Sequence, residues 1–353
     1  MAQPEFQNAR MLKALPALLL PWFQSARREL PWRRDREPYH VWLSEIMLQQ
    51  TRVEAVKGYY TRFLDRLPDI RALAGIDEDT LLKLWEGLGY YNRVRNLQKA
   101  ARLICTKYAG SFPSDLEAIR ALPGIGDYTA GAIASICYSL PTPAVDGNVL
   151  RVVTRYTGYY GCTDDAAVKK LIANTLKEIY PTDGNAGDFT QALMELGAIV
   201  CVPNGQPHCD SCPLAGCCVA RQQHLTDELP VRAEKKKRRQ DSITVFLLSC
   251  GDQIALDRRP STGLLAGLYQ FPSTEGHLSD EAAVKQAEDW GLSPCNVIKA
   301  VSRTHIFTHV QWNMLAYRLE CRSMSADFIW ADRETLQRQY ALPTAFRQFL
   351  QDF

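Results

Sequence analysis

Apolar residues recur with the period of an α-helix through most of residues 1–225. Two of the predicted helices begin with a capping box, in which a hydroxyl residue is followed three positions later by Glu: TRVE at 51–54 and SDLE at 114–117. The stretches WEGLGYYNRVRNLQKAARLI at 85–104 and NVLRVVTRY at 148–156 continue the helical pattern. The first 225 residues are therefore predicted to be predominantly helical.

The pattern changes at residues 226–240, TDELPVRAEKKKRRQ, which are polar and include five consecutive basic residues. This composition is typical of a solvated linker, and a phosphate-contacting strap and a localisation signal are the alternatives. Residues 241–353 mix strand and helix patterns: SITVFLLS, QIALDRR and WNMLAYRLE are strand-like, and EAAVKQAEDWG is helix-like. They predict a separate α+β domain.

Composition limits the classes of function. A chain of 353 residues is expected to form two domains, and its net charge of +2 means that any nucleic-acid signal must be local. No apolar run reaches the roughly 18 residues of a membrane span. The N-terminal MLKALPALLLPWF is interrupted by two prolines and lacks a signal-peptide cleavage site. We expect a soluble, intracellular protein without a membrane partner, and a monomer needs no further assumption.

Five of the eleven cysteines fall within residues 201–218. The spacing Cys201-x7-Cys209-x2-Cys212-x5-Cys218 is typical of a metal site rather than of a disulfide scaffold. Four thiolates suit tetrahedral zinc and a 4Fe–4S cluster equally, and the adjacent Cys217 is an alternative fourth ligand.

The segment LPGIGDYTAGAI at 122–133 predicts a tight turn between two helices, the second beginning near Asp127. Gly124 and Gly126 permit positive φ or close approach of the backbone to a ligand. The unpaired amides at the start of the second helix form an anion site suited to a DNA phosphate. An ordinary turn between helices is the alternative.

Two carboxylates are candidates for acid and base chemistry. Glu45 is the only acid in an apolar helical segment, where desolvation would raise its pKa and keep it protonated. Asp146 precedes a helix, so it is an expected N-cap that the helix dipole would hold ionised. Such a pair suits cleavage of a glycosidic bond, although a helix-edge Glu and a simple cap are the structural alternatives.

With these features in this order, the chain resembles the helix-hairpin-helix DNA glycosylases, and specifically the adenine DNA glycosylases of the MutY family. The resemblance covers nearly the whole chain and is carried by PWR (31–33), WLSEIMLQQTRV (42–53), WEGLGYYNRVRNL (85–97), LPGIGDYTAGAI (122–133), AVDGNVLRV (144–152), ALMELGAIVC (192–201), the cysteine loop, RPSTGLLAGLYQFP (259–272) and FTH (307–309). It implies an all-α glycosylase region at 1–225, a linker at 226–240 and an α+β Nudix-like domain at 241–353.

The resemblance also implies an activity: removal of adenine opposite 8-oxoguanine or guanine in double-stranded DNA, by flipping the base out of the duplex. Glu45 would protonate adenine at N7, and Asp146 would stabilise the oxocarbenium-like sugar, with Tyr128 and Asn148 in support. The remaining positions matched to DNA or substrate contacts are Arg33, Gln50, Tyr90, Gly124, Gly126 and Glu195. In a bacterium the enzyme would be cytoplasmic and associated with the nucleoid.

Tyr128 separates this chain from the bifunctional relatives, which resemble the hairpin but carry a lysine at that position that forms a Schiff base. The sequence Gly126-Asp127-Tyr128-Thr129 has no lysine, so we expect a monofunctional enzyme that leaves the strand uncut. The family's cysteine loop has six residues between its first two ligands, whereas this chain has seven. We expect a bulge in 202–208, with the four cysteines still binding a 4Fe–4S cluster.

The C-terminal domain resembles a Nudix fold without the Nudix active site. Its helix EAAVKQAEDWGL lacks the Glu cluster that holds Mg²⁺, so we expect recognition rather than hydrolysis. Phe307, Thr308 and His309 match a Phe-Ser-His loop that contacts 8-oxoguanine, with Thr retaining the hydroxyl. The remaining readings are a thymine- or uracil-mismatch glycosylase, a nucleotide-pool Nudix hydrolase, and a non-catalytic DNA-binding protein with structural zinc.

Overall fold

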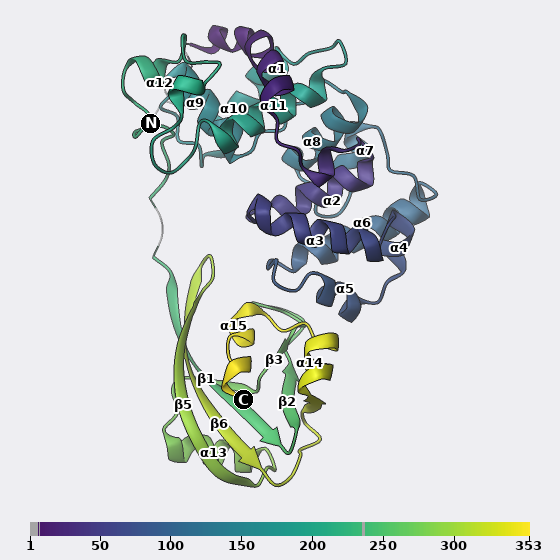
Figure 1. Cartoon of the computed structure of the whole chain (residues 1–353), viewed down its shortest axis with the longest axis vertical. Helices are drawn as coiled ribbons and strands as arrows, with labels where there is room; N and C mark the ends of the chain where they lie inside the picture. Colours follow the sequence, from purple (N-terminus) through teal and green to yellow (C-terminus); the bar gives the residue numbers. More distant parts are fainter. Residues whose placement is uncertain (1–5, 7, 235–236) are drawn as a thin grey trace. The chain divides into compact units, whose positions relative to one another are not determined.

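The computed structural model describes residues 6, 8–234 and 237–353, and side chains at 295–299 are not described. The chain divides into two compact units (Figure 1). The first contains Met1–Gly75 and Asn96–Glu234, and the second contains Ile76–Arg95 and Lys235–Phe353. None of the described helices combines the length and the apolar character that crossing a membrane requires.

The first unit is helical, which confirms the predicted fold class of this region. Its elements are η1 (Ala9–Ala14), α1 (Leu15–Ala26), η2 (Pro31–Arg33), α2 (Pro38–Leu48), α3 (Val53–Arg66), α4 (Ile70–Gly75), most of α6 (Asn92–Lys107), α7 (Leu116–Arg120), α8 (Asp127–Tyr138), α9 (Gly147–Thr157), α10 (Ala166–Lys177), α11 (Ala186–Ile199), η3 (Cys209–Ser211) and α12 (Val219–Gln222).

Helix α11 packs against α1, α8 and α9. Apolar side chains of α1, α9, α10 and α11 form one core, which includes Phe23, Val153, Ile172 and Leu193. Close packing depends on a glycine, because a Cβ at Gly197 of α11 would lie 3.0 Å from the Cα of Asn148 in α9. The two helices that carry candidate site residues are therefore fixed against each other by direct backbone approach.

Three local predictions were wrong. Helix α3 has Arg52 as its N-cap, not Thr51, whose hydroxyl instead bonds the carbonyl of Gln49. Helix α7 is capped by Asp115 rather than Ser114, since the Asp115 carboxylate accepts the N–H of Ala118. In α7, the carboxylate of Asp115 competes with the adjacent hydroxyl of Ser114 for the same amides and binds them more strongly.

The third error concerns residues 85–91, which the apolar period placed in a continuous helix. Helix α5 (Glu78–Leu84) ends before them, and α6 begins only at Asn92. Gly87 and Gly89 have φ of 97° and 70°, and Tyr90 has φ of 47°. Left-handed backbone cannot continue a right-handed helix, so the two glycines convert the expected helix into a loop.

The second unit is built on a mixed sheet of order β3-β2-β1-β6-β5, with β4 paired to β1 and β7 paired to β2. The strands are β1 (Arg239–Cys250), β2 (Gln253–Arg258), β3 (Tyr269–Gln270), β4 (Ser273–Glu275), β5 (Pro294–Ile306), β6 (Val310–Cys321) and β7 (Ile329–Asp332), and the helices besides α5 are α13 (Asp280–Asp289), α14 (Arg333–Gln339), α15 (Thr344–Arg347) and η4 (Leu350–Asp352). The predicted α+β class is confirmed.

Both faces of this sheet are covered. In β1, Val245 and Leu247 face a core shared with α14 and α15, whereas Phe246 and Leu248 face a core shared with α13. Successive strand residues point to opposite faces, so the continuous apolar run of this strand supplies both cores. Strands β1 and β6 are parallel, with Val245 opposite Ala316.

Candidate active site

Seven of the predicted site residues line one cavity of about 930 Å³ in the first unit, with walls from α2, α8, α9 and α11. They are Arg33, Glu45, Gln50, Tyr128, Asp146, Asn148 and Glu195. The hairpin glycines lie outside its lining, and Tyr90 and the loop 307–309 belong to the second unit. Residues far apart in sequence thus form one pocket of ligand-binding size.

Glu45 is 7% exposed in α2, and its carboxylate accepts a hydrogen bond of 2.5 Å from the hydroxyl of Tyr128 in α8. The pKa of Glu45 is raised to about 7, because burial and the charge of Asp146, which raise it, outweigh the hydrogen bond from Tyr128 and the charge of Arg33, which lower it. A carboxyl group with this pKa carries a proton in a substantial fraction of molecules at neutral pH. It is therefore suited to general acid chemistry.

Asp146 is the N-cap of α9, as the sequence predicted. Its two carboxylate oxygens accept hydrogen bonds from the N–H of Val149 at 2.8 Å and from the side-chain amide of Asn148 at 2.7 Å. Burial is the largest influence on the pKa of Asp146 and raises it, whereas these two donors lower it. The sequence did not indicate this burial, which works against the ionised form expected from the helix dipole.

Asn148 continues this network toward the cysteine loop. Its side-chain oxygen accepts a hydrogen bond of 2.8 Å from Arg151, which also donates to the carbonyls of Gly197 and Cys201, both at 2.7 Å. Asn148, which holds the carboxylate of Asp146, is therefore held in turn by Arg151, and this sets the orientation of that carboxylate before any ligand binds.

Glu195 is buried in α11 and is bound by two arginines. Arg28 donates to it from its backbone and twice from its guanidinium, and Arg33 donates at 2.9 Å. Burial alone would raise the pKa of Glu195, but these hydrogen bonds and charges lower it to about 2. Glu195 is thus a permanent anion that orients Arg33. Arg28 was missed from the sequence, because no motif marks it.

The Gly-rich hairpin joins α7 to α8 through residues 121–126, and α8 begins at Asp127 as predicted. Gly124 has φ of 77°, and a Cβ there would lie 2.7 Å from the Cβ of Asn96. Gly126 has an extended backbone, and a Cβ there would meet nothing within 4 Å. Gly124 is therefore required by the turn itself, whereas Gly126 leaves the start of α8 open to a ligand.

Cys201, Cys209, Cys212 and Cys218 line a second cavity. Burial raises the pKa of Cys212 to about 11 and also raises the pKa of Cys209 and Cys218. Within residues 6, 8–234 and 237–353, no group of three or more His, Cys, Asp and Glu side chains is arranged to hold a metal ion. The four thiols that line this cavity are nevertheless donors of the type that both tetrahedral zinc and an iron–sulfur cluster take.

Arg155 of α9 anchors this loop. Its guanidinium donates to the sulfur of Cys201 at 3.4 Å and to the carbonyl of Val202 at 3.0 Å. It also donates to the carbonyls of Thr226 and Leu229, both at 2.8 Å. The cysteine loop and the first part of the predicted linker are thus bound to the same side chain. Cys217 is exposed and does not line the cavity.

The loop 307–309 connects β5 to β6 in the second unit. Phe307 packs edge-on against His305 and Trp312, at ring distances of 4.6 and 4.9 Å. The hydroxyl of Thr308 lies 2.6 Å from the hydroxyl of Tyr90. Two residues predicted to contact DNA are therefore hydrogen-bonded to each other, a contact that their spacing in sequence gave no means of predicting.

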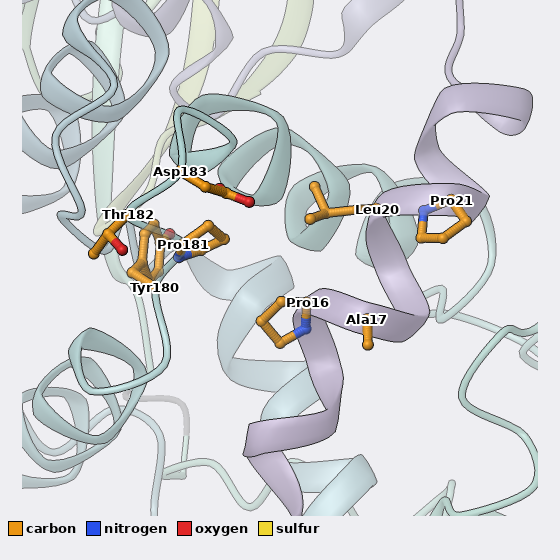
Figure 2. A pocket seen from close by; sticks show the side chains of 8 residues that line it. All are labelled: Pro16, Ala17, Leu20, Pro21, Tyr180, Pro181, Thr182 and Asp183. Atoms are coloured by element: carbon orange, nitrogen blue, oxygen red, sulfur yellow. The ribbon is translucent and has the colours of Figure 1, made fainter.

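A shallower hollow of about 480 Å³ contains none of the predicted residues (Figure 2). It lies where α1 faces the segment that follows α10, and it is lined by Pro16, Ala17, Leu20, Pro21, Tyr180, Pro181, Thr182 and Asp183. The two candidate catalytic carboxylates, Glu45 and Asp146, line the larger cavity instead.

Each of the two units matches a known protein family. Residues 43–181 match the HhH-GPD superfamily of base excision DNA repair proteins, and residues 244–352 match the NUDIX domain. A solved structure of a trapped endonuclease III–DNA covalent intermediate is 25% identical, with a TM-score of 0.52, covering 63% of this chain and 99% of that one. The chain is therefore an enzyme, a DNA glycosylase that acts on N-glycosyl bonds.

Comparison with individual relatives identifies the family within this superfamily. The human adenine DNA glycosylase is 33% identical over 374 residues, covering 89% of this chain and 68% of the relative. The adenine DNA glycosylase of Buchnera aphidicola is 33% identical over 344 residues, covering 95% of this chain and 96% of the relative. The chain belongs to the adenine DNA glycosylase family, the MutY family.

Proposed function

We propose that this enzyme removes adenine paired with 8-oxoguanine or with guanine in duplex DNA. The observation that carries the proposal is the pair formed by Glu45, whose pKa is raised to about 7, and Asp146, with both side chains in one cavity. One carboxyl group supplies a proton and the other faces a developing positive charge, which is the division that glycosidic cleavage needs. The names of the human and Buchnera relatives support adenine as the base.

In the proposed reaction, Glu45 transfers its proton to N7 of adenine. The electron pair of the bond between the sugar and the base then leaves with the base, and positive charge develops on the sugar. Asp146, held by Val149 and Asn148, stabilises that charge. Water adds to the sugar, and the proton that it releases restores the protonated form of Glu45, so the products are adenine and an abasic site.

We propose that the enzyme is monofunctional. The position that a lysine would need is taken by Tyr128, whose hydroxyl is engaged with Glu45. Burial raises the pKa of Tyr128 well above its ordinary value, so it stays a neutral hydrogen-bond donor. Among the described residues that line the cavity there is no lysine. Without an amine the abasic sugar does not form a Schiff base, and the strand stays intact.

We also propose that the second unit recognises the base opposite adenine. Phe307, Thr308 and His309 form a tight turn, closed by a hydrogen bond of 2.8 Å from the N–H of Phe307 to the carbonyl of Val310. Helix α13, which the resemblance matches to the Nudix catalytic helix, carries no REUxEE pattern. The domain would bind 8-oxoguanine without hydrolysing a nucleotide.

The cysteine-lined cavity is proposed to hold a 4Fe–4S cluster through Cys201, Cys209, Cys212 and Cys218. A cluster would tie the loop 201–218 to α9 and so support the DNA-binding surface, and it supplies no step of the hydrolysis. Measuring iron and zinc in the purified protein separates this proposal from structural zinc. The enzyme is proposed to act as a monomer inside the cell, where its duplex substrate lies.

The test of base specificity uses excess enzyme and a duplex with one adenine opposite 8-oxoguanine, compared with duplexes carrying guanine or thymine opposite the adenine. Strand scission at the adenine only after hot alkali is the expected result, and Asp146→Asn should abolish it. Scission without alkali would contradict the monofunctional proposal. Intact DNA after alkali, with the duplex still bound by the enzyme, would contradict the glycosylase proposal.

A further inference from the structure

The first residues of the linker are fixed to the first unit. The carbonyl of Val231 accepts hydrogen bonds from the N–H and the hydroxyl of Thr163, at 2.9 and 3.1 Å. The N–H of Ala233 donates to the carboxylate of Asp164 at 2.9 Å. Both neighbours of Arg232 are thus held by the segment that precedes α10, so the position of Arg232 along the chain is set by the catalytic unit.

Arg232 lines the candidate active-site cavity. A Cβ placed on Gly147 would lie 4.0 Å from its guanidinium, and Gly147 directly follows Asp146 at the start of α9. Burial is the largest cause of the lowered pKa of Arg151, and the nearby positive charge of Arg232 contributes to it. The guanidinium therefore lies at the end of the cavity where Asp146 is held.

Three of the other four described arginines that line the cavity already have acceptors, and the fourth, Arg52, is exposed at the start of α3. Arg28 and Arg33 bind Glu195, and Arg151 binds Asn148 and two carbonyls. Arg232 is exposed, and within the described part of the chain its guanidinium has neither a hydrogen bond nor an ion pair. An unpaired guanidinium at the rim is a donor set that matches the two free oxygens of a phosphodiester.

We propose that Arg232 is a positioning residue that binds a phosphate flanking the nucleotide extruded into this cavity. The inference rests on the proposed function only in that the cavity receives a nucleotide from duplex DNA. Binding that phosphate would hold the sugar of the extruded nucleotide beside Asp146. It makes the start of the linker part of the DNA interface, rather than a spacer between domains.

The first experiment compares the affinity of the full-length protein for a duplex with one tetrahydrofuran abasic site and for the same duplex undamaged. Arg232→Gln is expected to weaken binding to the abasic duplex about tenfold, in the range of one lost charge-assisted contact, and to change binding to the undamaged duplex less than twofold. Arg232→Lys should recover most of the loss. Arg66→Gln removes the same charge from an exposed site outside the cavity and should affect both duplexes equally.

The second experiment replaces each phosphate flanking the abasic site with an uncharged methylphosphonate. If Arg232 binds one of them, Arg232→Gln causes no further loss on that modified duplex, because the partner charge is already gone. Equal weakening on damaged and undamaged DNA, the full loss on both modified duplexes, or no loss at all would overturn the proposal. Failure of the wild-type protein to release adenine would reject the proposed function while leaving this result readable.

Discussion

The hydroxyl of Tyr128 and the carboxylate of Glu45, 83 residues apart in the sequence, are joined by a hydrogen bond of 2.5 Å. This contact connects the Gly-rich hairpin to the proposed general acid, because Tyr128 lies in the first turn of the helix that the hairpin begins. Tyr128 thereby offsets part of the rise in the pKa of Glu45 that burial causes. The hairpin thus does more than present backbone to DNA.

Glu45→Gln is expected to lower the single-turnover rate of adenine release by about 10²–10⁴-fold, because the amide cannot supply a proton. Binding to a duplex with a stable abasic analogue should change little, since the amide keeps the size of the side chain. Gel-based single-turnover kinetics, with alkali to reveal abasic sites, give the rate. A rate within threefold of wild type would remove Glu45 from the role of acid.

The rate of adenine release is expected to fall as pH rises through about 7, because Glu45 loses its proton there. Tyr128→Phe removes a hydrogen bond that stabilises the ionised carboxylate, so the pKa of Glu45 rises and this limb moves to higher pH. Single-turnover rates between pH 5.5 and 9 test the shift. A limb that stays in place or moves to lower pH would contradict the role given to Tyr128.

Glu45→Gln should also make the stability of the protein less dependent on pH. The pKa of Glu45 in the folded protein, about 7, exceeds its ordinary value of 4.5. The contribution of protonated Glu45 to the free energy of unfolding is therefore fully present below pH 4.5 and is lost as pH rises through 7. The substitution is expected to raise the free energy of unfolding at pH 8, relative to pH 5, by up to ~3 kcal/mol. Urea unfolding at both pH values measures this, and an unchanged difference would contradict the burial argument.

Glu195→Gln leaves Arg28 and Arg33 without their shared counter-charge, and we expect unfolding to become easier by ~2–4 kcal/mol. Arg36→Gln is a matched control, because its ion pair with Asp188 is at the surface and should contribute less than ~1 kcal/mol. Thermal and urea unfolding at pH 7 compare the two. Equal effects would mean that Glu195 is solvated rather than held by the arginines.

Cys212→Ser is expected to reduce the bound iron to less than half of the wild-type content and to weaken the visible absorption of the protein. Cys217→Ser should leave both unchanged, because Cys217 is exposed and lies outside the cavity that the other four cysteines line. Metal analysis of the two variants also resolves which cysteine is the fourth ligand. Loss of iron in the Cys217 variant would reverse that assignment.

The helical and α+β regions could be predicted from the sequence, because the apolar period reports local structure. Seven predicted site residues line one cavity, and each of them stands in a motif that is recognisable in the sequence. The sequence could not predict Arg28, because the partner of Arg28, Glu195, lies 167 residues away in the sequence. It could not predict Arg232 either, because only the folded chain brings this linker residue to the cavity. The loop at 85–91 was misread because the apolar period does not register two left-handed glycines. The burial of Asp146 depends on tertiary packing, which the spacing of residues in a sequence motif does not reveal.

The close approach of α11 to α9 makes Gly197 a position where natural sequence variants are expected to affect activity. A side chain of any size at this position would push against Asn148, and through it would tilt the carboxylate that Asn148 holds. We expect such a variant to release adenine more slowly than the wild type, because the carboxylate of Asp146 would no longer be held in place. A mutational scan that measures activity alone would therefore classify Gly197 with the catalytic residues, although Gly197 has no side chain and does not line the cavity.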